Sequence, residues 1–138
     1  MATKAPLIER LIEELEYPLL NVDNIKEFLD ANDYSVLFFT EDINRYPESN
    51  DVAVVLPELI QAFPQIKPAV IAREDEDQIQ SLFDFYAWPA LVFMRKDEHI
   101  ETITRIQDWS FYLEKINQIL TMPSQKTKGM NIPVVTVT

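Results

Sequence analysis

The sequence predicts an α/β domain with a central mixed β-sheet flanked by helices. Two continuous apolar runs of strand type, YSVLFFT at 34–40 and KPAVIA at 67–72, are separated by a stretch with helical periodicity. Two further strands, at 90–95 and 100–106, are joined by the short turn KDEH. A strand–helix–strand unit followed by a hairpin and a closing helix is typical of a mixed sheet.

The N-terminal part of the chain is predicted to add a helix, a short strand and a second helix. Pro6 can open the first helix, and Tyr17 with Pro18 ends it. Residues 19–22 are a short strand candidate, and Asp23 caps the helix that follows.

The helix between the two central strands is indicated by a long run of apolar residues at helical spacing. These residues are Val52, Val55, Leu56, Leu59, Ile60 and Phe63. Pro57 lies inside the pattern, and we therefore expect the helix to be kinked there.

Two more helices are predicted in the second half of the chain. The first precedes the hairpin and carries Ile79, Leu82, Phe83 and Tyr86 on its inner face. The second follows the hairpin and is capped by Asp108, with Trp109, Leu113, Ile116, Ile119 and Leu120 inside. Residues 122–138 are expected to form a flexible tail, although its IPVVTVT segment can also pair with a sheet edge.

The charge of the chain is strongly negative and unevenly distributed. The net charge is −11, and residues 1–84 alone hold 18 acidic and six basic side chains. This balance argues against nucleic acid and anionic membranes as partners, because binding to phosphate needs clustered lysine and arginine. The acidic half either keeps the protein soluble or attracts a basic partner.

Several kinds of chemistry are excluded by residues that the sequence lacks. There is no cysteine, and the single glycine, Gly129, lies near the C-terminus, so a thiolate site and a glycine-rich phosphate loop are both excluded. His99 lies in a charged turn without the serine and aspartate spacing of a triad. The acidic stretch REDED at 73–77 lacks the glycine of a calcium loop and more readily begins a helix. We expect no metal, no cofactor and no catalytic residue.

A cytoplasmic location is expected for this chain. Glu9, Arg10, Glu13 and Glu14 interrupt the N-terminal segment, which therefore does not resemble a secretory signal. No apolar run approaches the roughly 20 residues that a membrane helix needs.

The element order and two prolines resemble the thioredoxin fold over residues 19–121. Thioredoxins have a proline kink in the helix after the central strand, which Pro57 matches, and a cis-proline before the fourth strand, which Pro89 matches in YAWPALVFMRKDEH. The resemblance implies one thioredoxin-like domain at 1–121 with a cis Trp88–Pro89 bond. It also implies that the backbone of Trp88 is exposed to grip an extended peptide.

The sequence departs from thioredoxins at the redox motif. Counting back from Pro57 places Ser49, Asn50, Asp51 and Val52 where that family has its CxxC motif. A serine hydroxyl is not appreciably ionised near neutral pH and does not exchange with disulfides. We therefore expect a protein that is not an enzyme.

Among thioredoxin-like chains without cysteine, this one is similar to the hydrogenase accessory proteins of the HyaE/HupG type. The resemblance rests on the acidic chain, the N-terminal helix and the stretches TEDINRYPESNDVAVVLPELIQAFP and FYAWPALVFM…IQDW. It implies a chaperone in [NiFe]-hydrogenase maturation that binds the small subunit and its twin-arginine signal region before assembly and export. Other hydrogenase accessory proteins are further partners on this interpretation. The alternative is a cysteine-less scaffold or dimerisation module in another assembly.

In a thioredoxin fold, three segments of this chain would meet at one end of the sheet and form a peptide-binding groove. The residues expected to line it are Ser49, Asn50, Asp51, Trp88, Pro89, Gln107 and Trp109. Trp88 is expected at the surface, whereas Trp109 fits either a ligand contact or the inner stripe of the last helix. Asp51, with nearby Glu41, Asp42 and Glu48, is expected to meet the arginines of the ligand.

Overall fold

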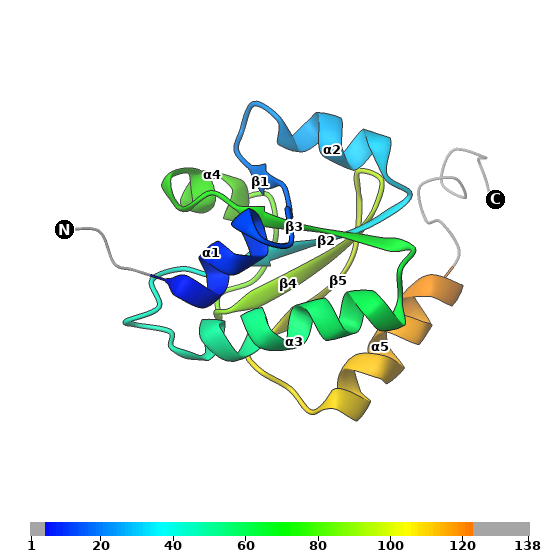
Figure 1. Cartoon of the computed structure of the whole chain (residues 1–138). Coiled ribbons are helices and arrows are strands. Elements are labelled where there is room, and N and C mark those ends of the chain that lie inside the picture. The colour runs from blue at the N-terminus through cyan, green and yellow to red at the C-terminus, as the bar shows by residue number, and fades with distance from the viewer. Residues whose placement is uncertain (1–4, 123–138) are drawn as a thin grey trace.

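The structure, a computed structural model, describes residues 5–122 and has a five-stranded sheet with helices on both faces (Figure 1). The helices are α1 (Pro6–Glu13), α2 (Ile25–Ala31), α3 (Glu48–Ala62), α4 (Glu76–Gln80) and α5 (Trp109–Thr121), and the short 3-10 turn η1 covers Arg73–Asp75. The strands are β1 (Leu19–Leu20), β2 (Tyr34–Phe39), β3 (Ile66–Ile71), β4 (Ala90–Arg95) and β5 (Glu98–Thr104). The predicted tail lies, apart from Met122, outside the described residues.

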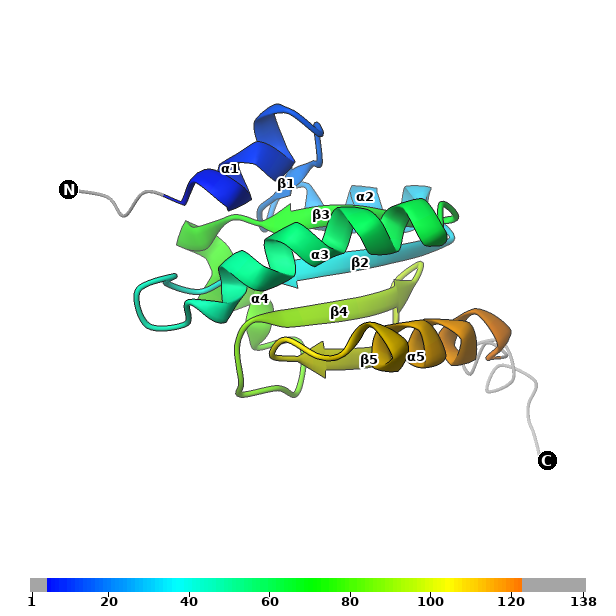
Figure 2. The ribbon, with the colours of Figure 1, turned by 60° about the horizontal axis from the view of Figure 1, so that its bottom comes forward.

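The sheet is mixed, as the sequence predicts, with the strand order β1-β3-β2-β4-β5. The strands β1, β3 and β2 are parallel, whereas β4 runs antiparallel to both β2 and β5. The carboxyl ends of β2, β3 and β5 therefore lie at the same end of the sheet as the start of β4 (Figure 2). We call this end the site end.

Two apolar cores hold the layers together. One core joins α1, α3 and α5 to one face of the sheet, and its centre includes Leu11, Leu56 and Ile116. The other joins α2 and α4 to the opposite face, and includes Leu29 and Ile79. Alternation along β2 explains this division, because its successive side chains point to opposite faces.

The outer part of β3 contains a proline. Val70 and Ala72 donate their backbone N–H groups to the carbonyls of Pro18 and Leu20 beside β1. Pro68 lies two residues before Val70, where β1 has not yet begun to pair. N–H groups two residues apart on a strand point to the same side, so the nitrogen of Pro68 faces the uncovered edge.

The prediction of a helix that carries Leu82 and Tyr86 inside is wrong. Helix α4 ends at Gln80, and the side chains of Leu82 and Tyr86 are 70% and 80% exposed. The chain beyond α4 is held by Phe85, which is buried and packs edge-to-face on Phe39 with ring centroids 5.0 Å apart. The side chain of Gln80 also donates to the carbonyl of Phe85 at 2.6 Å.

The hairpin and the last helix also differ in detail from the sequence-based expectation. Strand β5 begins at Glu98, so His99 lies in a strand and its ring packs on Phe83 at 5.3 Å. At the start of α5, Trp109 is 43% exposed and Tyr112 is buried in its place. In the part of the chain that the structure describes, no helix is both long and apolar enough to cross a membrane.

Candidate peptide-binding site

The structure brings the three predicted segments together at the site end. The chain after β2 leads to the start of α3, Trp88 and Pro89 precede β4, and the turn after β5 begins at Arg105. Direct contacts join them, since the Arg105 N–H donates to the Pro89 carbonyl at 2.7 Å. The same arginine forms an ion pair with Glu48 at the start of α3.

An open cleft of about 340 Å³ lies between these segments. It is lined by Arg45, Tyr46, Pro47, Glu48, Trp88 and Arg105. The rings of Tyr46 and Trp88 are tilted by 45°, with their centroids 5.6 Å apart. The guanidinium of Arg45 lies over the Tyr46 ring at 5.3 Å, so the cleft combines an aromatic wall with positive charge.

Trp88 is less exposed than the sequence suggested. Its side chain is only partly exposed, and it packs on Phe85 as well as Tyr46. Its indole N–H is buried, and it has no hydrogen-bond partner among the described residues. One face of the ring therefore supports the loop before β4, while the cleft-lining part remains available to a ligand.

The backbone around Trp88 is also open to a partner. The Trp88–Pro89 bond is cis, and Pro89 itself is buried. Within residues 5–122, the N–H and C=O groups of Trp88 take part in no backbone hydrogen bond. A peptide chain could therefore pair with this residue as an added strand.

Glu48 is engaged within the protein. Its carboxylate accepts both an Nε–H and an Nη2–H bond from Arg105, at 3.2 and 2.8 Å, and a third bond from the Ile106 N–H at 3.1 Å. These bonds, led by that of Arg105, lower the pKa of Glu48 to about 2. Glu48 is therefore already paired within the protein, and its expected contact with an arginine of the ligand stays a prediction.

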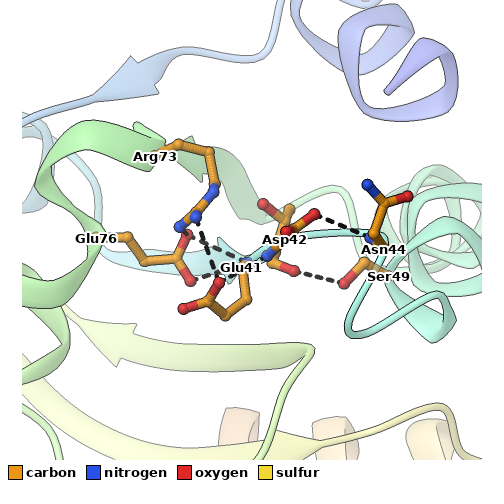
Figure 3. Close-up of polar contacts among 7 residues, drawn as sticks. Glu41, Asp42, Asn44, Ser49, Arg73 and Glu76 are labelled. Atoms are coloured by element: carbon orange, nitrogen blue, oxygen red, sulfur yellow. Dashed lines mark hydrogen bonds and ion pairs between the residues drawn. The ribbon is translucent and has the colours of Figure 1, made fainter. Parts of the chain in front are cut away.

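Ser49 is also turned inward, contrary to its predicted place in the groove. Its side chain is fully buried, and its hydroxyl donates to the Thr40 carbonyl at 2.6 Å (Figure 3). It thus ties the start of α3 to the end of β2. Its neighbours Asn50 and Asp51 are partly exposed and exposed, so they remain accessible on the first turn of α3.

The turn after β5 is held by Gln107. Its N–H donates to the Tyr112 hydroxyl at 3.1 Å, and its side-chain amide donates to the Thr104 carbonyl at 2.8 Å. These bonds fix the turn, so that Gln107 positions the segment. Trp109, next to this turn, is accessible to a partner.

A buried glutamate at the site end was missed by the sequence interpretation. Glu76, only 1% exposed, accepts the Glu41 N–H at 2.9 Å and pairs with Arg73 at 3.3 Å (Figure 3). Burial raises the pKa of Glu76 to about 7, against the opposing effect of Arg73. The signal was present, because Glu76 lies three residues before Ile79 on the same helical face.

The comparisons with known proteins agree with this architecture. A family model described as Hydrogenase-1 expression protein HyaE matches residues 7–112. The chain belongs to the HyaE family. This result confirms the resemblance seen in the sequence.

Relatives of the HyaE-family chain include two hydrogenase expression/formation proteins. HoxO from Azotobacter vinelandii is 47% identical over 115 residues, which span 83% of this chain and 78% of that protein. HupG from Rhizobium leguminosarum bv. viciae is 40% identical over 116 residues, which span 80% and 78% of the two chains.

Solved structures confirm that this HyaE-family chain has a thioredoxin-like fold. The crystal structure of a HupG protein from Rhodopseudomonas palustris CGA009 matches with a TM-score of 0.54 and 37% identity, covering 75% of this chain and 94% of that one. Oxidised mitochondrial thioredoxin 3 from Saccharomyces cerevisiae matches with a TM-score of 0.62 at 20% identity, covering 73% and 92%. The second match shows the fold alone.

Proposed function

We propose that this protein is a non-catalytic chaperone in [NiFe]-hydrogenase maturation. It binds the hydrogenase small subunit through its twin-arginine signal region, in the cytoplasm, before assembly and export. Membership of the HyaE family, which is described as hydrogenase expression proteins, supports a role in hydrogenase maturation. The binding role rests on the cleft beside Trp88. Among the described residues, the N–H and C=O groups of Trp88 have no backbone hydrogen-bond partner.

The cleft suits an extended peptide for two physical reasons. The free N–H and C=O groups of Trp88 can pair with a peptide backbone, which supplies affinity without regard to sequence. The rings of Trp88 and Tyr46 offer apolar area to one side chain of that peptide.

The basic residues of the signal are expected to bind outside the cleft. Arg45 and Arg105 line the cleft, and Glu48 is already paired, so a guanidinium is disfavoured there. Asp51 is exposed on the adjoining first turn of α3, and Asp42 lies on the loop before it. These two carboxylates are the best placed to meet arginines.

The absence of thiols supports a role without catalysis. The position of the first thioredoxin cysteine is Ser49, whose buried hydroxyl is bonded to Thr40. Disulfide reductase and isomerase assays are therefore expected to read no activity above a buffer control. Turnover that copurifies with the protein through several columns would contradict this.

The binding role is tested by titrating the signal peptide of the cognate small subunit into the protein and following tryptophan fluorescence. Trp88→Ala should weaken binding about tenfold, because both the ring and its support of the loop are lost. Phe111→Ala, which removes an exposed aromatic ring from α5, is the matched control and should bind like the parent.

The alternative of a scaffold or dimerisation module makes a different prediction. The parent would then not bind the signal peptide, and sedimentation would instead show concentration-dependent self-association. Equal affinities of the parent and Trp88→Ala would show that the peptide binds elsewhere.

A further inference from the structure

We propose that the loop between α4 and β4 is a docking surface for the apolar segment that follows the basic residues of the bound signal. This inference rests on the proposed function and extends its site. Secretory signals carry a positively charged segment and then an apolar segment of about 7–15 residues. The loop presents exposed apolar side chains in a part of the chain that is rich in acidic residues.

The two outward side chains of this loop are its main feature. Tyr86 is 80% exposed and Leu82 is 70% exposed, which makes them the most exposed large apolar residues in the described part of the chain. Single exposed apolar residues are ordinary on protein surfaces. Here two strongly exposed side chains occur on the single connection between α4 and β4, which indicates an interaction surface.

The loop holds these side chains outward because their neighbours anchor it. Phe83 and Phe85 both pack edge-to-face on Phe39, at 6.1 and 5.0 Å between ring centroids. Phe85 also contacts Trp88 at 5.7 Å. Because Phe83 and Phe85 point into the core, the side chains of Leu82 and Tyr86 are left on the surface.

The charge around the loop selects the kind of partner. From Glu74 to Met94, both included, the chain has no lysine or arginine, and it has five acidic residues. Two of these are exposed, Asp77 on α4 and Asp84 on the loop itself. A segment that is apolar and borders basic residues is favoured there, whereas an acidic one is repelled.

The position of the loop makes it continuous with the cleft. The chain runs directly from Tyr86 through Ala87 to Trp88, which lines the cleft. Figure 2 shows that the connection from α4 to β4 turns at the same end of the sheet as the connection from β2 to α3. A peptide that leaves the cleft along this connection would reach Tyr86, two residues before Trp88.

Three peptides and two variants test this proposal by titration. The first peptide is the signal region of the cognate small subunit. The second keeps its basic residues but has serine and glycine in place of its apolar segment. The third is a lysine–leucine peptide of unrelated sequence. The double variant Leu82→Ser with Tyr86→Ser removes the patch, and Val54→Ser, at a 53% exposed position of α3, is its control.

We expect the parent and Val54→Ser to bind the first peptide roughly tenfold more tightly than the second. The double variant should lose this difference and bind both peptides as the parent binds the second. Thermal melts followed by circular dichroism should show the same fold for all three proteins, since every changed side chain is exposed.

The possible failures are distinguishable. If the double variant binds the first peptide like the parent, the docking surface is refuted and the proposed function stands. If the parent binds only the lysine–leucine peptide, and binding depends on Leu82 and Tyr86, the patch binds apolar basic segments but the signal region is not the ligand, and both proposals about the signal are overturned. If no peptide binds, both proposals are overturned.

Discussion

Ser49 occupies the position of a thioredoxin thiol and supports the fold instead. Its buried hydroxyl satisfies the Thr40 carbonyl at the end of β2. Ser49→Ala should lower the free energy of unfolding by about 1–3 kcal/mol, because that carbonyl loses its partner. Urea denaturation measures this, with the exposed Ser110→Ala as control. Peptide affinity should not change, and a weaker affinity at unchanged stability would contradict the structural role.

Glu76 predicts how stability depends on pH. Its pKa in the folded protein is about 7, raised chiefly by burial from an ordinary value of 4.5. A raised pKa means that the folded state binds the proton more tightly than the unfolded state. The resulting stabilisation is complete below about pH 4.5 and is lost as the pH rises through about 7. It amounts to on the order of 3 kcal/mol.

The variant Glu76→Gln should lack this dependence. Between about pH 5 and about pH 8, the parent should lose stability relative to the variant. Denaturant titrations at several pH values measure the difference. Burial lowers the pKa of His99, which makes stability rise with pH. His99 is present in both proteins, so its effect cancels when the two are compared. A pH-independent difference would show that Glu76 is not protonated near neutral pH.

Among the elements, the start of α3 and the turn after β5 are linked by the Glu48–Arg105 pair. Both side chains are partly exposed, so solvent screens their attraction and the coupling should be small. A double-mutant cycle with Glu48→Gln and Arg105→Gln, read by urea denaturation, measures it. The stabilisation should fade as the pH drops towards the Glu48 pKa of about 2. Additive effects of the two variants would show that the pair contributes nothing.

The elements differ in how well the sequence predicts them. Strands β2 and β4 were evident because residues buried on both faces of a sheet form continuous apolar runs. The segment after α4 was not, since Ile79, Leu82, Phe83 and Tyr86 fit a helical stripe by spacing alone. Tertiary contacts of Phe83 and Phe85 decide the local structure there, and periodicity does not report them.

For the whole molecule, topology explains why the meeting of the three segments could be predicted although the directions of their side chains could not. Once the strand order is known, the three segments must meet at one end of the sheet. The direction of each side chain depends on local contacts, so the inward turn of Ser49 and the pairing of Glu48 were not predictable. Functional surfaces are where such rules are expected to fail.

The negative charge of the whole molecule predicts salt-sensitive binding. Affinity for the signal peptide should fall as ionic strength rises from about 0.05 to about 0.3 M, because the screening length falls below about 10 Å over this range. Asp51→Asn should reduce this dependence, and Glu58→Gln, an exposed acid elsewhere on α3, should affect it less. Isothermal titration at several salt concentrations measures both slopes. Equal slopes for Asp51→Asn and the parent would place the basic contacts elsewhere.

Pro68 has a consequence for aggregation. In the part of the chain that the structure describes, β1 does not pair with the first residues of β3, and an unpaired strand edge is where a foreign strand could hydrogen-bond to a sheet. The proline removes the donor that would face such a strand, at no cost to the ladder with β2. An unpaired strand edge can otherwise template pairing with another chain. Pro68 thus blocks one route by which copies of the sheet could stack edge to edge.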